Sequence, residues 1–389
     1  MELLKESNYL EYRKFVENHK NGSFYQTIEW ANVKNKWDFE VIVSRDDDGA
    51  IVGGMLVLLR PLPFCGTMMY SPRGPVCDYD DINTISNLLC DVRELAKQRK
   101  SFVFKFDPFI MAKNTSFCSC MKLLGAKHKA PKDDFSSMQI SSNYLLDISH
   151  KSPEELLMSF HQKWRYNIRL SQKKGVVCER GGVEDIDAFY ELMKQTGVRD
   201  KFVIRPKQYF ADMLEKLGEK NCRLFLCRSA EGIPLSGAIA VQFAKKAYYV
   251  YGASSNTHRE LMPNHLMQWN MMNWALENSC ESYDFLGIPN CENPNASEYG
   301  VYLFKKGFNG SVVKYAGDFC LVFSPVKYAL TQAGISTVRF LRYRLAKVNS
   351  FLLRKRSKSG GNDPPAHPDA PVFCTKRFSA LKAHLLSKI

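Results

Sequence analysis

Arg205 and Tyr209 are two side chains whose types and spacing could bind an anion. They stand four residues apart in the run Arg205-Pro206-Lys207-Gln208-Tyr209. If Pro206 opens a helix, residues four apart share one helix face, and the guanidinium and the phenol then point at the same phosphate or carboxylate. This pair is therefore predicted to bind an anionic substrate group.

The net charge of +14 also indicates an anionic partner, because such a surplus raises the local concentration of polyanions. The charge is clustered in two blocks, and the second begins at Arg339. The first block consists of Lys163, Arg165, Arg169, Lys173 and Lys174. Nucleic acid, anionic lipid or a phosphorylated substrate would suit these blocks, and a merely solvated face is the alternative.

Common catalytic and cofactor motifs are absent from the sequence. It contains no Gly-x-x-x-x-Gly-Lys-Ser/Thr phosphate loop, no Gly-x-Gly-x-x-Gly fingerprint and no Gly-x-Ser-x-Gly elbow. The twelve cysteines are spread along the chain without a Cys-x-x-Cys pair, which favours reduced, buried thiols over disulfides or zinc. We expect no metal and no cofactor.

The elements that would position these residues occur twice. Residues 48–57 read like residues 231–240, each an acidic-Gly turn that opens an apolar run. In each half an apolar run follows, ending at Tyr70 in the first half and at Tyr251 in the second. An amphipathic segment comes next, at 82–97 or 264–277, and then another strand, at 102–106 or 283–286. This order predicts a duplicated α/β domain with the active cleft on one module or between the two.

With 389 residues and 45% hydrophobic content, the chain can bury two cores. We predict a first domain over 1–148, ending in a strand at 144–148, and a second over 149–323. The remaining 324–389 is predicted to hold a basic amphipathic helix near 339–358 and a linker.

No signal-peptide pattern or membrane-length apolar run occurs, so we expect a cytoplasmic protein, held at the inner membrane face by its basic tail.

Six polar-aromatic clusters occur in an order that resembles one family. They are residues 30–37, 70–76, 106–108, 205–209, 251–254 and 304–308. Together they resemble the Fem/Mur (FemABX) family of aminoacyl-tRNA-dependent transferases that build peptidoglycan cross-bridges, with the compact FemX type closest in outline. The resemblance runs from Phe24 to Tyr328. It implies an α/β fold of tandem GNAT-like acyltransferase domains, without an inserted coiled-coil arm because 209–237 has room only for one helix and one strand.

The resemblance also implies which residues bind the muramoyl-pentapeptide substrate. They are Lys34, Asn35, Lys36, Trp37, Ser71, Arg73, Arg205, Tyr209 and Tyr251. Core packing is the alternative role for Tyr251, and Lys34 could be an ordinary surface lysine. Tight-turn geometry alone would explain the prolines and the glycine of residues 71–75.

The family's Phe-Lys pair near the tRNA acceptor end corresponds to Phe304 and Lys305, where the lysine would neutralise charge developing on the ester. Asp107 resembles a family aspartate proposed as the base for the incoming amine, although a carboxylate at a strand end can equally cap a loop. The basic residues of 163–174 are the candidate tRNA contacts.

The inferred reaction is aminolysis of an aminoacyl-tRNA ester by an amine of the stem peptide. The donated residue would be Gly, Ala or Ser, and the acceptor UDP-MurNAc-pentapeptide or lipid II. We expect a monomer that aligns two large substrates and stabilises an oxyanion. A tRNA-independent N-acyltransferase that uses a thioester, or a non-catalytic tRNA- or envelope-binding module, are the alternatives.

Overall fold

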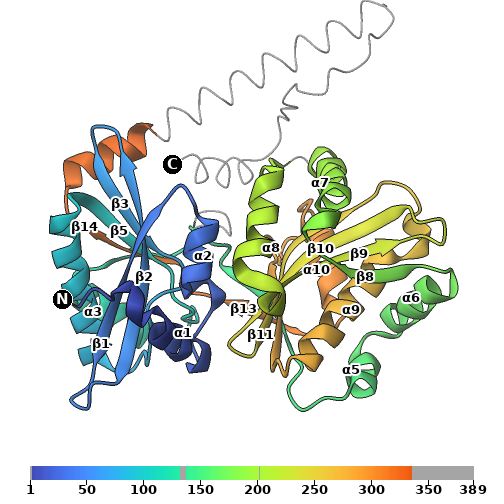
Figure 1. Ribbon diagram of the computed structural model, residues 1–389, viewed down its shortest axis with the longest axis horizontal. Helices are drawn as coiled ribbons and strands as arrows, with labels where there is room; N and C mark the ends of the chain where they lie inside the picture. Colours follow the sequence, from blue (N-terminus) through green and yellow to red (C-terminus); the bar gives the residue numbers. More distant parts are fainter. Residues whose placement is uncertain (1, 132–136, 201, 335–389) are drawn as a thin grey trace, which may run out of the picture.

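Two mixed β-sheets form the framework of the protein, one in each half of the molecule (Figure 1). The structure is a computed structural model that describes residues 2–131, 137–200 and 202–334. The first sheet has the strand order β1-β2-β3-β5-β14-β6, with β4 paired to β2. Its strands are β1 (Asp38–Arg45), β2 (Ile51–Leu62), β3 (Gly66–Ser71), β4 (Val76–Cys77), β5 (Ser101–Phe106), β6 (Lys127–Lys129) and β14 (Asp318–Val322).

The second sheet has the order β13-β7-β12-β11-β10-β9-β8. Its strands are β7 (Ser142–Asp147), β8 (Val177–Gly181), β9 (Cys222–Arg228), β10 (Pro234–Phe243), β11 (Lys246–Ser254), β12 (Ser282–Gly287) and β13 (Ser311–Lys314). β11 pairs with β12 only over residues 246–248, so the two parallel strands are not hydrogen-bonded to each other beyond that point.

The predicted repeat is confirmed in the order of elements. β2 and β3 form an antiparallel hairpin, helix α3 (Ile82–Gln98) crosses over, and β5 runs parallel to β3. In the second half, β10, β11, α9 (Pro263–Glu277) and β12 repeat this arrangement. The local sequence specifies the first helix well, because Asp81 accepts a hydrogen bond from the Thr84 backbone and the apolar side chains fall on one face.

Two strands do not belong to the predicted domains. The strand predicted to close the first domain is β7, which pairs with β12 and β13 in the second sheet, so that prediction is wrong. Conversely β14, predicted in the second domain, pairs with β5 and β6 in the first sheet. The chain therefore passes from the first half to the second before β7 and returns to the first half before β14. Local periodicity could not reveal these crossings, because strand pairing is a long-range property.

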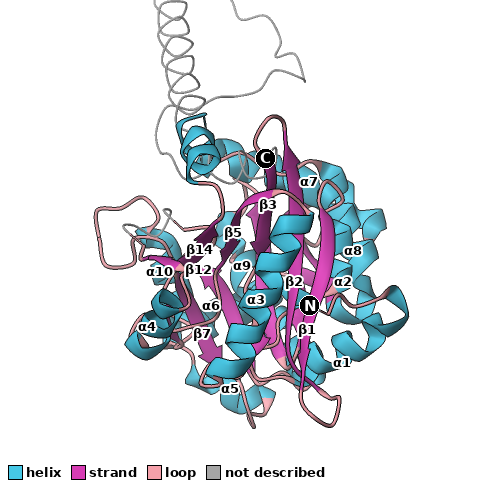
Figure 2. Ribbon diagram, turned by 90° about the vertical axis from the view of Figure 1, so that its left-hand side faces the viewer, coloured by secondary structure: helices cyan, strands magenta, loops and turns pink. Residues whose placement is uncertain are grey.

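The helices form layers on both sides of the sheets. α3 and α4 (Thr115–Leu123) cover the outer face of the first sheet (Figure 2), and α1 (Tyr9–Asn18), α2 (Ile28–Val33), α7 (Ile186–Asp200) and α8 (Lys207–Asn221) share a core between the sheets. The far face of the second sheet is covered by α5 (Pro153–Ser159), α6 (Gln162–Lys173), α9 and α10 (Tyr299–Lys306). One buried core thus joins residues from both halves.

The connection between α8 and β9 is direct, because the helix ends at Asn221 and the strand begins at Cys222. The described chain accordingly carries no inserted helical arm there, as predicted. Among the described residues, no helix has the length and apolar character needed to cross a membrane. The predicted basic helix at 339–358 lies outside the described residues.

Candidate functional site

Lys34 and Tyr209 meet between the two halves of the molecule, where α2 packs on α8. Thr27 caps α2 by accepting from the Trp30 backbone, and Lys34 follows the last turn of that helix. The Lys34 Nζ atom donates to the Tyr209 hydroxyl at 2.9 Å and lies 4.4 Å from the Trp30 ring centre. The Arg205 guanidinium carbon lies 5.1 Å from the Tyr209 ring centre. Two cations therefore flank one phenol.

Arg205 reaches this phenol differently from the prediction. Pro206 is the N-cap of α8, so Arg205 precedes the helix and stacks over the Tyr209 ring instead of sharing its helix face. The Tyr251 ring lies 6.1 Å from the Tyr209 ring, centre to centre, and both are half-buried. Lys34, Arg205, Tyr209 and Tyr251 therefore lie in one cluster, which we call the cation–tyrosine cluster.

The electrostatics of this cluster favour an anion. Burial lowers the pKa of Lys34 to about 8, and the Arg205 charge acts in the same direction. Within the described parts of the chain, no carboxylate forms an ion pair with Lys34 or Arg205. A phosphate or carboxylate placed between them would thus gain two charge-assisted contacts without displacing an internal carboxylate.

The three predicted residues that follow Lys34 in the sequence do not contact the cation–tyrosine cluster through any side-chain interaction described above. The Asn35 amide donates to Asp212 at 3.2 Å, which ties α2 to α8. Lys36 is exposed, and its backbone carbonyl accepts from Arg60. Trp37 is half-buried against a small hydrophobic cluster near the turn of the β2–β3 hairpin. Their predicted substrate contacts stay predictions.

Arg73 and Asp107 form a second cluster at the ends of β3 and β5. The Arg73 backbone N–H donates to Asp107 Oδ1 at 2.9 Å, and the Tyr70 hydroxyl lies 3.2 Å from both Asp107 oxygens. The Arg73 guanidinium carbon lies 4.8 Å from the Phe109 ring centre and 5.0 Å from that of Tyr315. Its Nε atom is buried and has no hydrogen-bond partner among the residues that the structure describes. The guanidinium is thus desolvated and incompletely satisfied, as a ligand-binding arginine would be.

Asp107 has the properties of a base. Only 2% of its surface is exposed, and burial raises the pKa of its carboxyl to about 7, against the opposing effect of the Arg73 charge. A carboxyl that titrates near neutrality can take and release a proton at working pH. The same carboxylate also caps a loop, as the alternative for this residue predicted, because it accepts a hydrogen bond from the Arg73 backbone N–H.

Ser71 is fully buried and accepts from the Gln26 amide at 3.1 Å, so it helps to hold the turn, and its predicted substrate contact stays a prediction. Gln26 also donates to the Pro72 carbonyl at 2.6 Å and accepts from the Leu56 backbone at 2.8 Å. This glutamine fixes the turn that carries Arg73. Sequence reasoning missed it because a single glutamine near a helix start has no distinguishing pattern.

Lys305 lies on α10 with 5% of its surface exposed. Its ammonium donates to the carbonyls of Phe285 at 2.6 Å and Gly287 at 2.8 Å, with the Leu286 carbonyl more distant at 3.5 Å. These carbonyls lie at the end of β12, beyond its pairing with β11. Burial lowers the Lys305 pKa to about 7, which the negative charge of Asp284 partly opposes.

Phe304 packs its ring among Trp164, His265 and Phe308, and its carbonyl accepts from the Trp164 indole at 3.0 Å. The ring therefore anchors α10 to α6 and α9. The structure thus gives Phe304 a supporting place beside Lys305, while its predicted catalytic role stays a prediction.

Asp284 links the Arg73 and Lys305 regions and was missed at the level of sequence. It is 4% exposed and accepts from the Asn143 amide at 3.0 Å and the Leu286 backbone at 2.7 Å. Burial raises its pKa, whereas its hydrogen bonds and the charges of Arg73 and Lys305 act in the opposite direction. A lone acid inside the apolar strand 283–286 was the available signal, since buried charges need partners.

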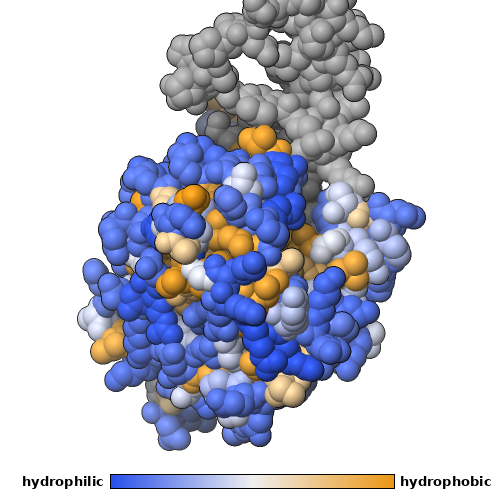
Figure 3. Space-filling view, turned by 90° about the vertical axis from the view of Figure 1, so that its right-hand side faces the viewer, coloured by the Kyte–Doolittle hydropathy of each residue, from blue (hydrophilic) through white to orange (hydrophobic). Residues whose placement is uncertain are grey.

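The basic residues of α6 lie mostly on the surface. Lys163, Arg169, Lys173 and Lys174 are exposed, on a side of the molecule that is largely hydrophilic (Figure 3). Arg165 is instead engaged, donating to the carbonyls of Met158 and Phe160. Because α6 contacts α10 through Trp164, this basic face adjoins the helix that carries Lys305.

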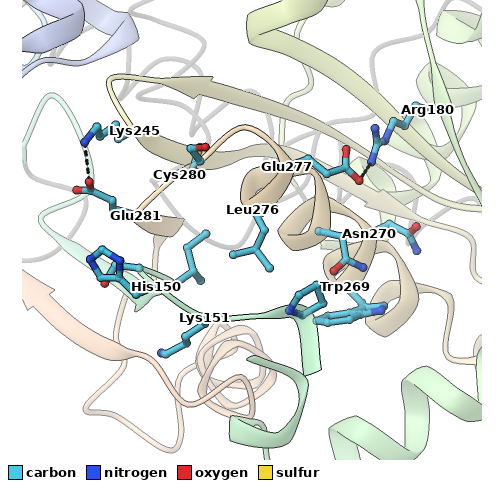
Figure 4. Close-up of a pocket in the computed structure, with 15 residues that line it drawn as sticks. His150, Lys151, Arg180, Lys245, Trp269, Asn270, Leu276, Glu277, Cys280 and Glu281 are labelled. Carbon is cyan, nitrogen blue, oxygen red and sulfur yellow. Dashed lines mark hydrogen bonds and ion pairs between the residues drawn. The ribbon is translucent and has the colours of Figure 1, made fainter. Parts of the chain in front are cut away.

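A separate pocket of about 850 Å³ lies along α9, outside these clusters (Figure 4). Trp269, Leu276 and Cys280 contribute to its lining. Two ion pairs, Lys245–Glu281 at 2.8 Å and Arg180–Glu277 at 2.7 Å, lie in its wall. None of the predicted site residues lines it, so it is not the candidate active site.

Known proteins are similar to this chain in sequence. The model of the FemAB family matches residues 8–228 and 224–334. The lipid II:glycine glycyltransferase of Staphylococcus aureus (strain USA300) is 30% identical over 417 aligned residues, covering 89% of this chain and 97% of the relative.

Two solved structures extend the comparison. A crystal structure of FemX superimposes with a TM-score of 0.79 at 29% identity, covering 85% of this chain and 99% of that one. A tandem GNAT protein from the clavulanic acid pathway has a TM-score of 0.50 at 12% identity, covering 83% of this chain and 98% of that one, a likeness of fold alone. Sequence and structure agree that this chain belongs to the FemAB family.

Proposed function

We propose that this protein transfers an amino acid from aminoacyl-tRNA to an amine of the peptidoglycan stem peptide, extending the interpeptide bridge. The amine nitrogen attacks the ester carbonyl carbon and a C–N bond forms. The C–O bond to the tRNA ribose then breaks, and the proton lost by the amine ends on the ribose oxygen. The relative named lipid II:glycine glycyltransferase supports this reaction class. The proposed donated residue is glycine, alanine or serine.

The observation that carries the proposal is the buried ammonium of Lys305 at the end of β12. Two of its hydrogen bonds are short, whereas the third partner, the Leu286 carbonyl, is 3.5 Å away. The N–H that faces this weak partner can turn to a developing oxyanion at little cost. A charged donor in a desolvated place stabilises such an oxyanion more strongly than one in water.

The remaining clusters take the other parts of the reaction. The cation–tyrosine cluster binds an anionic group of the acceptor, a phosphate or carboxylate of UDP-MurNAc-pentapeptide or lipid II. Asp107, with its pKa near 7, accepts the proton of the attacking amine, and Arg73 holds the acceptor beside it. The exposed basic face of α6 receives the tRNA backbone and leads its acceptor end toward α10.

Transfer is tested by incubating the full chain with tRNAs charged with glycine, alanine or serine and with each acceptor form in turn. Mass spectrometry of the products identifies the donor and the acceptor together. Uncharged tRNA plus free amino acid is the matched control and should give no product. Product formed from an aminoacyl thioester but not from any charged tRNA would contradict the proposal.

A further inference from the structure

The tip of the β2–β3 hairpin exposes a large apolar side chain that the reaction does not use. Phe64 stands at the turn with its side chain entirely in solvent. Residues 325–334, which are helical, expose Val326 and Leu330 to 70% and 63%. Single exposed apolar side chains are common on proteins, whereas several that gather in one place mark an interaction surface.

The hairpin and this helix form one surface. The residues packed against Met68 and Phe102 include Leu62 from the hairpin and Tyr328 from the helix. Tyr328 faces this small core, so Val326 and Leu330, each two residues away, point outward. In Figure 1 the hairpin and the orange helix lie together at one end of the molecule. We call Phe64, Val326 and Leu330 the apolar tip.

The surroundings of the apolar tip are basic. The segments that adjoin there, residues 60–67, 99–101 and 325–334, contain Arg60, Arg99, Lys100 and Lys327 and no acidic residue. Arg99 forms an ion pair with Glu40 of β1, so the rim rests mainly on the two lysines. The backbone of Thr67 donates to the Lys100 carbonyl, which joins the first two segments. Lys100 and Lys327 are exposed. An apolar centre within a basic rim matches the interface of an anionic bilayer, where rings enter the headgroup layer and lysines meet phosphates.

We propose that the apolar tip and its basic rim form a membrane-docking surface for anionic lipid. The described residues end at 334, next to this surface, and in the sequence that follows residues 339–358 contain eight basic residues and no acidic one. The surface itself follows from exposure and charge. Its use in catalysis rests on the proposed function, since a lipid-linked acceptor would be presented at that membrane.

The test uses the full chain and sedimentation with vesicles of phosphatidylcholine, with and without anionic phosphatidylglycerol. The parent should bind the anionic vesicles preferentially. Phe64→Ser should weaken binding about tenfold, given the apolar area that a phenylalanine buries. Lys100→Gln with Lys327→Gln should weaken binding to anionic vesicles and leave binding to neutral ones unchanged.

Leu123→Ser is the matched control, because Leu123 is 89% exposed at the end of α4, which covers the opposite face of the first sheet. It should bind vesicles like the parent. Equal vesicle binding by Phe64→Ser, by the double lysine variant and by the parent would overturn the proposal and leave residues 335–389 as the membrane contact. Transfer to the soluble nucleotide-linked acceptor is read in parallel, so that a failure of the proposed reaction is distinguished from a failure of docking.

Discussion

Replacing Lys305 with methionine separates charge from packing at the candidate centre. Methionine keeps most of the buried volume of the lysine stem but cannot donate to an oxyanion. Loss of one oxyanion donor costs about 10²–10³ in kcat, or roughly 3–4 kcal/mol. We therefore expect Lys305→Met to lose at least that factor in transfer, measured by single-turnover formation of the aminoacylated acceptor.

The same substitution has a signature in stability. The folded pKa of Lys305 is about 7, below that of a lysine in the unfolded chain, so above neutral pH the folded state releases a proton that the unfolded state keeps. The cost of burying the ammonium is fully present below pH 7 and is relieved as pH rises. Between about pH 6 and pH 9, the parent should gain roughly 3 kcal/mol in unfolding free energy relative to Lys305→Met.

Lys306→Met is the matched control, since Lys306 is the exposed neighbour on the same helix. It should keep both the parent rate and the parent pH dependence of urea unfolding. A Lys305→Met enzyme that turns over near the parent rate would refute the assignment of Lys305 to the oxyanion. A pH-independent stability difference between parent and variant would refute the account of its burial.

Three further changes test the other clusters. Arg205→Ala should raise the acceptor KM about tenfold or more and leave kcat nearly unchanged, because a charge-assisted contact acts in the ground state as well; collapsed kcat at the parent KM would move Arg205 into the chemistry. Asp107→Asn should lower kcat about 10²-fold and abolish the rise in rate near pH 7 on the acid side, and a retained rise would exclude Asp107 as the base. Gln26→Leu should lower the unfolding free energy by about 1–3 kcal/mol in urea, because the buried Leu56 N–H loses its acceptor; unchanged stability would contradict that role.

The predictable part of the fold was local. The strand–strand–helix–strand units follow from turns, alternation and apolar periodicity, all of which act within a few tens of residues. The exchange of β7 and β14 between the sheets has no local signal, since either strand could pair with several edges. The error in the domain boundary therefore arose where backbone pairing, and not side-chain pattern, decides the topology.

The site shows the same division. Lys34 and Tyr209, 175 positions apart, were named through family resemblance, and the structure brings them to 2.9 Å. Asp284 and Gln26 were missed because their importance lies in what surrounds them after folding. A buried acid and a buried amide differ from surface ones only through desolvation and partners, which a single sequence does not specify.

The two segments in which the chain passes from one sheet to the other meet around Arg73. Tyr315, just before β14, stacks on the Arg73 guanidinium, and the Ile140 carbonyl, just before β7, lies 3.5 Å from it. The Asp318 carboxylate accepts from the Met138 backbone at 2.8 Å, which joins the two connections directly. The segments that hold the halves together are thus the ones that surround Arg73. The proposed aminolysis would depend chiefly on aligning two large substrates, so a junction built in this way would contribute to it by limiting relative motion of the two proposed binding surfaces.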